Sequence, residues 1–427
     1  MSGSPESPGR TATASPALSP EALAAAHSAS AAFVVRTPVL TSSSISVHCG
    51  GTVAVKAENL QRTGSFKLRG ALNKLRHLPP GTAGVVAGSA GNHGQSVAYA
   101  ARANKLRCEV FMPVGAAVSK VAAVQAFGAT VHQQAESVDE CVALARERAA
   151  AGELAFVHPF DDEWIVAGQA GVGVELAADV PDLAAVVVPV GGGGLAAGIA
   201  LAVKARLPGV RVIGVQAAAC APLAASLAAG HPVPAGVAAT IADGIAIKRP
   251  GELTLALLSE LLDDLVSVDE TAIAEAMVLL LERAKLVVEG AGAAGVAALL
   301  SGAIAPTPTG ITVAVLSGGN VDAALLAGLA ARHETEVGRR IRLLTRVPDR
   351  PGGLAGLLAL IASDNVNVLN VEHVRDGVPL GVRQTGVELT LETRGREHGE
   401  VLLADLREHG YELIEVPHPE VPVPVAH

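Results

Sequence analysis

Lys67 is the residue of this chain whose setting best suits covalent chemistry. It follows a short apolar stretch, Val53–Val55, and a polar turn, and lies in the first turn of a helix that Ser65 is expected to cap. A positive charge is disfavoured at the start of a helix because the backbone dipole is already positive there. The neutral amine attacks carbonyl groups, so the position favours a lysine that forms an imine. A solvated lysine on an ordinary helix is the alternative that this stretch leaves open.

A run of four glycines, Gly191–Gly194, predicts a phosphate site. It follows an apolar strand expected at 184–189 and directly precedes a helix expected from Leu195. Without side chains the backbone can close around a phosphate, and the amides at a helix start point towards it. A simple turn would not need four glycines, which lose conformational entropy on folding. A dinucleotide site fits poorly because no Asp or Glu ends a strand about twenty residues later.

Polar residues also occupy other junctions between expected strands and helices. Ser89–Asn92 follows an apolar strand, Glu289 precedes a glycine-rich helix, and Ser317 ends the last strand before a Ser-Gly-Gly turn. Side chains at such junctions suit a ligand site. Two of these residues also have a structural explanation, since Asn92 could cap a helix and Ser317 could belong to a plain turn.

Four segments in this order resemble the serine/threonine dehydratases, which are pyridoxal-phosphate enzymes of the tryptophan-synthase-β-like fold. They are Ser65–Ala71 (Ser-Phe-Lys-Leu-Arg-Gly-Ala), Ser89–Gln95, Gly191–Leu195 and Ser317–Asn320. The resemblance extends over residues 36–332, and the segment Thr240–Ile245 is also typical of the dehydratase branch. Motifs of this kind become informative when the expected strands and helices surround them, as they do here.

The resemblance implies a role for each motif residue. Lys67 would bind pyridoxal 5'-phosphate covalently and remove the substrate α-proton as a general base. Asn92 would bond the ring hydroxyl of the cofactor, and Ser317 its pyridine nitrogen, where a neutral partner suits elimination better than transamination. The implied cofactor-binding residues are Lys67, Phe66, Asn92, Gly191, Gly192, Gly193, Gly194, Leu195, Glu289 and Ser317. The implied substrate-binding residues are Ser89, Ala90, Gly91, Asn92 and His93, with His93 expected to be structural rather than catalytic.

The expected activity is the dehydration and deamination of L-threonine to 2-oxobutanoate and ammonia, with L-serine as a secondary substrate. It would feed isoleucine biosynthesis or threonine catabolism. Alternatives on the same scaffold are a serine or hydroxyaspartate ammonia-lyase and a β-replacing synthase for cysteine. A non-catalytic amino-acid sensor is the alternative from another class, and it would require a missing lysine or a broken phosphate loop. Both are intact.

At two places the sequence differs from the related racemases, and both differences argue against properties of those enzymes. The racemases carry a serine acid/base where this chain has Ala90, so racemisation would lack a second proton donor. They also carry acidic metal ligands where this chain has Gln216–Pro222, a segment without carboxylates. We therefore expect no tightly bound divalent metal, while a monovalent ion held by backbone carbonyls stays open.

Composition limits the possible partners. Half of the 427 residues are hydrophobic and 2% are aromatic, which suits a buried parallel sheet of Ala, Val and Leu. The net charge of −9 and the lack of a basic block argue against nucleic acid as a partner. No apolar run is long enough for a membrane span, so no membrane partner is expected. The four scattered cysteines predict reduced thiols in a cytoplasmic protein: Cys49, Cys108, Cys141 and Cys220.

The order of elements predicts an α/β fold with open parallel sheets and helices on both faces. The resemblance implies two subdomains, as in fold type II of the pyridoxal-phosphate enzymes. Expected strands are 53–57, 84–88, 108–112, 130–133, 155–157, 184–189, 210–216, 265–268 and 312–316. Expected helices are 21–32, 92–104, 119–127, 137–151, 164–178, 195–207, 255–262, 270–282 and 291–300, besides the helix that carries Lys67.

Four regions are expected along the chain: a disordered extension at 1–20, a catalytic domain at 21–330, a linker at 331–340 and a small domain at 341–418. The last has the order βαββαβ of a split-βαβ sandwich and resembles an ACT regulatory domain. Its loop Asp349–Gly353 resembles an ACT effector loop, whose backbone amides would bind an amino acid such as isoleucine or valine. The alternative is a plain dimerisation module. By resemblance we expect a homodimer or homotetramer.

Overall fold

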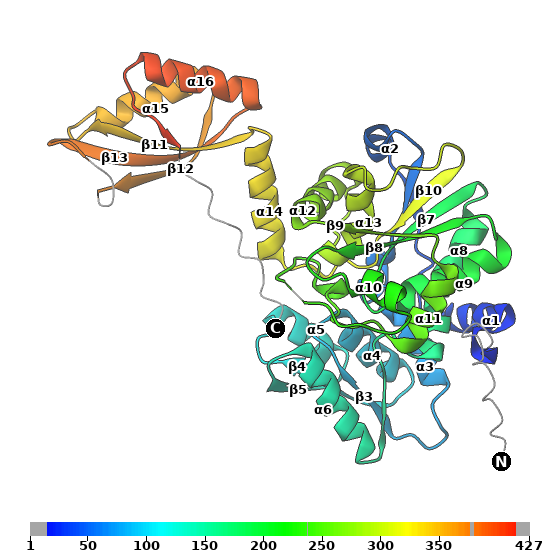
Figure 1. Cartoon of the computed structure of the whole chain (residues 1–427). Helices are drawn as coiled ribbons and strands as arrows, with labels where there is room; N and C mark the ends of the chain where they lie inside the picture. The colour runs from blue at the N-terminus through cyan, green and yellow to red at the C-terminus, as the bar shows by residue number, and fades with distance from the viewer. Residues whose placement is uncertain (1–14, 237, 376–379, 416–427) are drawn as a thin grey trace, which may run out of the picture. The chain divides into compact units, whose positions relative to one another are not determined.

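The computed structural model describes residues 15–236, 238–375 and 380–415 (Figure 1). The chain divides into two compact units with a boundary between Asp322 and Ala323, and each is described by itself. The extension predicted at 1–20 lies largely outside the described residues. Its end forms the 3-10 helix η2 (Pro16–Leu18), which leads into α1 (Pro20–Ser30). Across the described ranges, no helix has the length and apolar character needed to cross a membrane.

The larger sheet of the first unit has the order β1-β2-β10-β7-β8-β9. Its strands are β1 (Val39–Thr41), β2 (Val53–Lys56), β7 (Leu183–Pro189), β8 (Arg211–Ala217), β9 (Asp264–Val268) and β10 (Ile311–Val315). Neighbouring strands are parallel except at the edge, where β1 pairs antiparallel with β2. Such a sheet is buried on both faces, which explains its Ala- and Val-rich strands.

Helices α9 (Gly194–Arg206) and α13 (Gly290–Leu300) cover opposite faces of this sheet. Val186 and Val188 of β7 belong to the core that includes α9, whereas the alternate Val187 faces Gly295 of α13. The remaining helices of this subdomain are α2 (Ser43–Cys49), α8 (Gly171–Asp179), α10 (Pro222–Ala229), α11 (Glu252–Leu261) and α12 (Glu270–Leu279), with short turns η3 (Glu58–Leu60), η4 (Asp243–Ile245) and the π-helical η5 (Leu280–Ala284).

The smaller sheet of the first unit is parallel throughout and has the order β5-β4-β3-β6. Its strands are β3 (Gly84–Gly88), β4 (Arg107–Pro113), β5 (Thr130–Ala135) and β6 (Leu154–Phe156). Its helices are α4 (Asn92–Ala103), α5 (Val118–Ala126) and α6 (Val138–Ala150). Helix α3 (Lys67–Arg76) packs against both α4 and α7 (Glu163–Gln169). The predicted class, open parallel sheets covered by helices in two subdomains, is confirmed.

Some predicted elements differ in detail. The helix expected over 164–178 is two helices, because α7 ends at Gln169 and α8 begins at Gly171. Helix α3 begins at Lys67, and no described side chain caps it, so Ser65 is not its cap. Ser65 instead forms a β-bridge with Gly318, which joins the lysine segment to the end of β10. The alternation of elements did not predict β1, α2 or α10, whose sequences are short.

The second unit contains the predicted βαββαβ order. Helix α14 (Ala323–Glu336) precedes β11 (Arg340–Pro348), α15 (Gly353–Ser363), β12 (Asn367–Val374), β13 (Gln384–Glu392), α16 (Arg396–Glu408) and β14 (Ile414–Glu415). The four strands form an antiparallel sheet in the order β12-β13-β11-β14. Leu357, Ile361, Leu402 and Leu406 of α15 and α16 close its core. Helix α14 occupies the first part of the stretch predicted as a linker, at 331–340.

Candidate active site

A cavity of about 350 Å³ in the first unit is lined by every residue that the sequence predicts as a site residue. The segments that form it follow the carboxyl ends of three strands: Ser89 comes directly after β3, Gly191 shortly after β7 and Ser317 shortly after β10. Ligands of open α/β sheets bind at such strand ends. The fold therefore brings together residues that are far apart in the chain, as the motif order predicts.

Lys67 reaches this cavity from the first position of α3. Its Nζ donates a hydrogen bond to the carbonyl oxygen of Pro159 at 2.7 Å. Burial of the amine lowers the pKa of Lys67 to about 8, against the opposing influence of the Glu289 carboxylate. The direction of the shift matches the expectation from the helix start, but its main cause is desolvation. At such a pKa about a tenth of the amine is uncharged at pH 7, far more than for an ordinary lysine.

The glycine run forms a turn that no side chain could occupy. A Cβ at Gly192 would lie 2.3 Å from the ring of Phe160, and one at Gly193 would lie 2.9 Å from Leu258 Cδ1. Gly193 also has a φ of 95°, which disfavours other residues. The turn leads directly into the 13-residue helix α9. Amides at the start of such a helix attract anions, so this surface suits a phosphate.

Asn92 lies at the centre of a hydrogen-bonded chain of side chains. Its Nδ2 donates to Glu289 Oε1 at 2.7 Å, and its Oδ1 accepts from Asn320 Nδ2 at 2.7 Å. Burial raises the pKa of Glu289 to about 7, and the nearby charge of Asp243 adds to this. Gly64 and the motif residue Gly318 leave room for these side chains, since a Cβ at Gly64 would lie 2.3 Å from Asn320 Oδ1 and one at Gly318 would lie 2.2 Å from Glu289 Oε1.

Ser89, His93 and Ser317 complete the predicted set. Ser89 Oγ accepts from the amide of Gly91 at 3.1 Å and so shapes its own loop. His93 Nε2 bonds the carbonyl oxygen of Val157 at 2.9 Å, and burial lowers the pKa of His93 to about 3. His93 is therefore a neutral group held by the backbone. Ser317 is 4% exposed, and its carbonyl oxygen accepts from the amide of Phe66 at 3.1 Å.

The site also contains residues that the sequence did not predict. Lys120 of α5 pairs with Asp243 at 2.6 Å, and both line the cavity. Pro159 accepts the Lys67 hydrogen bond across 92 positions of sequence, and Phe160 covers the glycine turn. Asn320 belongs to the motif Ser317–Asn320, for which the resemblance implies a role only at Ser317. Asp243 also had a signal, since it lies in the segment Thr240–Ile245. Lys120, Pro159 and Phe160 had none, because contacts between distant parts of the chain leave no spacing pattern.

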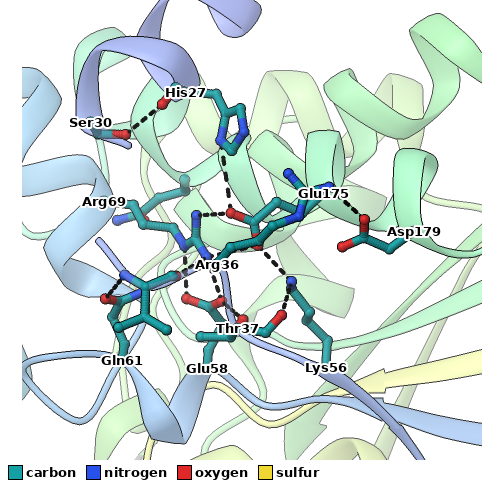
Figure 2. Close-up of polar contacts among 12 residues, drawn as sticks. His27, Ser30, Arg36, Thr37, Lys56, Glu58, Gln61, Arg69, Glu175 and Asp179 are labelled. Carbon is teal, nitrogen blue, oxygen red and sulfur yellow. Dashed lines mark hydrogen bonds and ion pairs between the residues drawn. The ribbon is translucent and has the colours of Figure 1, made fainter. Parts of the chain in front are cut away.

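A buried cluster of charges anchors the start of α3 (Figure 2). Arg69, two residues after Lys67, binds Glu58 at 2.7 Å and Glu175 at 2.8 Å. Lys56 of β2 binds the same Glu175 at 2.6 Å and also donates to the carbonyl oxygen of Thr37. Burial opposes ionisation of Glu58, but the adjacent Arg69 lowers the pKa of this carboxyl overall. The cluster joins α3 to β2, η3 and α8, and so fixes the segment that carries Lys67.

Comparison with known proteins agrees with this geometry. The family model described as pyridoxal-phosphate dependent enzyme matches residues 31–318. The L-threonine ammonia-lyase of Geobacter sulfurreducens is 42% identical over 385 residues, which are 90% of this chain and 95% of that protein. The catabolic L-threonine dehydratase of Escherichia coli K12 is 42% identical over 292 residues, which are 68% of this chain and 89% of that protein.

Solved structures show the same fold. A threonine deaminase from T.th. has a TM-score of 0.66 and 40% sequence identity, covering 70% of this chain and 97% of that one. Maize serine racemase has a TM-score of 0.69 and 33% identity, covering 74% of this chain and 98% of that one.

The residues present fit the cofactor of this family. Lys67 offers an amine with a lowered pKa for the aldehyde, and the glycine turn offers a side-chain-free surface at a helix start for the phosphate. The chain belongs to the family of pyridoxal-phosphate-dependent enzymes.

Proposed function

We propose that this protein is a threonine ammonia-lyase, which converts L-threonine to 2-oxobutanoate and ammonia and accepts L-serine as a secondary substrate. The observation that carries the proposal is one cavity containing both the Lys67 amine and the glycine turn, in a chain that is similar over 90% of its length to an L-threonine ammonia-lyase. The cavity volume of about 350 Å³ suits a small amino acid beside a cofactor.

Bound pyridoxal phosphate supplies an electron-withdrawing ring that makes the α-proton of an amino acid more acidic. Lys67 accepts that proton, since its amine is partly uncharged near neutral pH. Asn92, oriented by Glu289 and Asn320, would hold the cofactor ring, since its amide nitrogen has a second hydrogen to donate. The loop Ser89–Asn92 at the start of α4 holds the substrate carboxylate.

Ala90 disfavours racemisation in this scheme. A racemase needs a second acid/base on the opposite side of the α-carbon, and a methyl group cannot transfer a proton. With Lys67 as the acid/base on one side, departure of the β-hydroxyl is favoured over return of the proton from the other side.

The test is a 2-oxoacid assay on the purified protein with L-threonine, L-serine and 3-hydroxyaspartate. We expect turnover to be fastest with L-threonine and to be lost in Lys67→Ala. Borohydride reduction followed by peptide mapping should place the cofactor on Lys67. Faster turnover of serine or hydroxyaspartate would move the assignment to those ammonia-lyases. Normal threonine turnover by Lys67→Ala would reject the proposed role of the lysine.

The proposal extends to the regulation of the protein, its oligomeric state and its location in the cell. The first unit, which ends at Asp322, acts as the catalytic domain, and the βαββαβ part of the second unit acts as an ACT domain that binds isoleucine or valine. Gly352, with a φ of 91°, precedes α15, and its loop resembles an effector site. We further propose a homodimer or homotetramer in the cytoplasm, where the thiols of Cys49, Cys108, Cys141 and Cys220 remain reduced.

A further inference from the structure

We propose that helix α11 is a positioning element for the phosphate site, in which the hydroxyl of Thr254 turns the Gly192–Gly193 peptide so that its amide faces the phosphate. This inference rests on the proposed role of the glycine turn. It concerns residues outside every sequence motif described above, since Thr254 lies between the dehydratase-like segment Thr240–Ile245 and the glycine-rich helix after Glu289.

The first observation is a short hydrogen bond to the glycine turn. Thr254 is fully buried, and its Oγ1 donates to the carbonyl oxygen of Gly192 at 2.6 Å. Peptide bonds between described residues are trans, and in a planar trans peptide the carbonyl and the following N–H point in opposite directions. The Gly193 N–H therefore points away from Thr254. Gly192, Gly193 and Gly194 line the cavity, so this amide is directed to the side where an anion would bind.

The second observation is that Thr254 is itself held from outside its helix. Asp161 Oδ2 accepts from the amide of Glu252, and its Oδ1 accepts from the amide of Thr254, each at 3.1 Å. These are first-turn amides of α11 that have no partner within the helix. Gly251 makes the approach possible, since a Cβ there would lie 2.1 Å from Asp161 Oδ1. Asp161 thereby fixes the position and orientation of Thr254 relative to the glycine turn.

The third observation connects this system to the reactive lysine. Three successive residues act on the site: the Pro159 carbonyl accepts from Lys67 Nζ, the Phe160 ring fills the space over Gly192, and Asp161 holds α11. His158 Nδ1 accepts from the amides of Phe160 and Asp161 and fixes this turn. Burial lowers the pKa of His158 to about 4, so the ring is neutral and able to accept. One short segment thus contacts both the amine end and the phosphate end of the site.

The hydroxyl, rather than the shape of Thr254, is the functional feature. Valine has nearly the same volume but would leave the buried carbonyl of Gly192 without a donor, and a buried carbonyl without a partner is unfavourable. The peptide could then turn its carbonyl towards the cavity, where it would repel a phosphate. The variant would therefore bind the phosphate group of the cofactor more weakly, while reaction with the aldehyde would not change.

The experiment compares pyridoxal phosphate with pyridoxal, which lacks the phosphate, as ligands of the apo-protein. Dissociation constants are measured by absorbance for the wild type, Thr254→Val and Thr254→Ser, with circular dichroism as the control for folding. For pyridoxal phosphate we expect Thr254→Val to raise the constant about tenfold and Thr254→Ser to change it less than about threefold. For pyridoxal we expect both variants to stay within about twofold of wild type. The phosphorus resonance of bound cofactor should shift in Thr254→Val only.

Equal weakening of both ligands in Thr254→Val would mean that Thr254 only supports the fold, and the inference would be rejected. An unchanged constant for pyridoxal phosphate would reject it as well. If Thr254→Val does not fold, Thr254→Ala removes the same hydroxyl from a smaller side chain and is compared with Thr254→Ser. Because no amino-acid substrate is involved, the result is independent of whether threonine is turned over, which tests the proposed function separately.

Discussion

At the scale of single residues, burial controls the two ionisable groups nearest the proposed chemistry. Desolvation lowers the pKa of Lys67 to about 8 and raises that of Glu289 to about 7. Both shifts favour the uncharged form, as expected for groups removed from water. The cavity therefore presents an amine that is readily free and a carboxyl that is readily protonated near neutral pH.

The shift at Lys67 predicts how the apo-protein takes up its cofactor. Only the free amine reacts with an aldehyde, so we expect the rate of covalent incorporation to rise with pH and level off above about 8, rather than near 10.5. Between these pH values the unfolded chain binds more protons, so Lys67 makes the apo-protein more stable as pH rises. Borohydride trapping at a series of pH values measures the midpoint. A midpoint close to 10.5 would contradict the prediction.

The pKa shift of Glu289 predicts the opposite dependence of stability on pH. Its pKa is raised on folding from 4.5 to about 7, so the folded state binds the proton more tightly and is favoured at low pH. This contribution is fully present below about pH 4.5 and is lost as pH rises through about 7. Glu289→Gln should flatten the dependence of unfolding free energy on pH in that window, because glutamine does not titrate. The test is urea unfolding of the wild-type and Glu289→Gln apo-proteins at about pH 5 to 8. If the free energy of unfolding changed with pH in the same way in both proteins, the prediction would be wrong.

At the scale of elements, the start of α3 depends on buried charge rather than on a helix cap. No described side chain caps this helix, whereas Arg69 is held by Glu58 and Glu175, and all three side chains are buried. Removing one member of such a cluster leaves the others as uncompensated buried charges. The cluster is therefore a strong anchor only while it is complete.

Arg69→Ala should lower the free energy of unfolding by about 3–5 kcal/mol, the range for breaking a buried ion pair. The matched control is Arg36→Ala. Arg36 pairs with Asp179 in the same region, but its side chain is 53% exposed, and an exposed pair contributes less than about 1 kcal/mol. Denaturant unfolding of the two variants compares them. Equal losses would contradict the conclusion that the buried charges of this cluster anchor α3.

The glycine turn allows a second test at this scale. Gly192→Ala places a methyl group 2.3 Å from the Phe160 ring, and overpacking of this kind costs about 1–3 kcal/mol. We expect weaker binding of pyridoxal phosphate, because the ring or the turn must move. Gly209→Ala is the control, since a Cβ there has no heavy atom of the described chain within 4 Å. Equilibrium titration of each apo-protein with pyridoxal phosphate compares their affinities. Unaltered binding by Gly192→Ala would contradict the proposal that the glycine turn binds the phosphate.

At the scale of the whole molecule, the chain joins the unit that contains the cavity to a unit with the βαββαβ order. If the second unit binds an amino-acid effector, isoleucine or valine should change the threonine concentration at half-maximal rate in the full-length protein. Gly353→Ala should weaken this response and leave the rate without effector unchanged, because a Cβ at Gly353 would lie 2.2 Å from the carbonyl oxygen of Pro348. Steady-state assays with and without each amino acid test this. A full response in the variant would place the effector elsewhere.

Patterns in the sequence were enough to predict the fold class, and the resemblance of four motifs to a known family implied the cofactor and the motif residues that line the cavity. Strand-to-helix junctions and glycine runs are local patterns. The turns and exposed helix-start amides that they produce depend on the same few residues. The βαββαβ order of the second unit was likewise readable from periodicity. Predictions failed where neighbours in space decide the outcome: Ser65 bridges to Gly318 instead of capping α3, and the helix over 164–178 is divided at Ala170.

The groups that act on the motif residues became known only from the folded chain. The Pro159 carbonyl beside Lys67, the Asn320 amide on Asn92 and the Thr254 hydroxyl on Gly192 join segments 92, 228 and 62 residues apart. The extent of burial also belongs to the folded state, and it sets the ionisation of Lys67 and Glu289. A hydrogen bond or a desolvated charge depends on distance in space, which a one-dimensional pattern records only when the partners share one element.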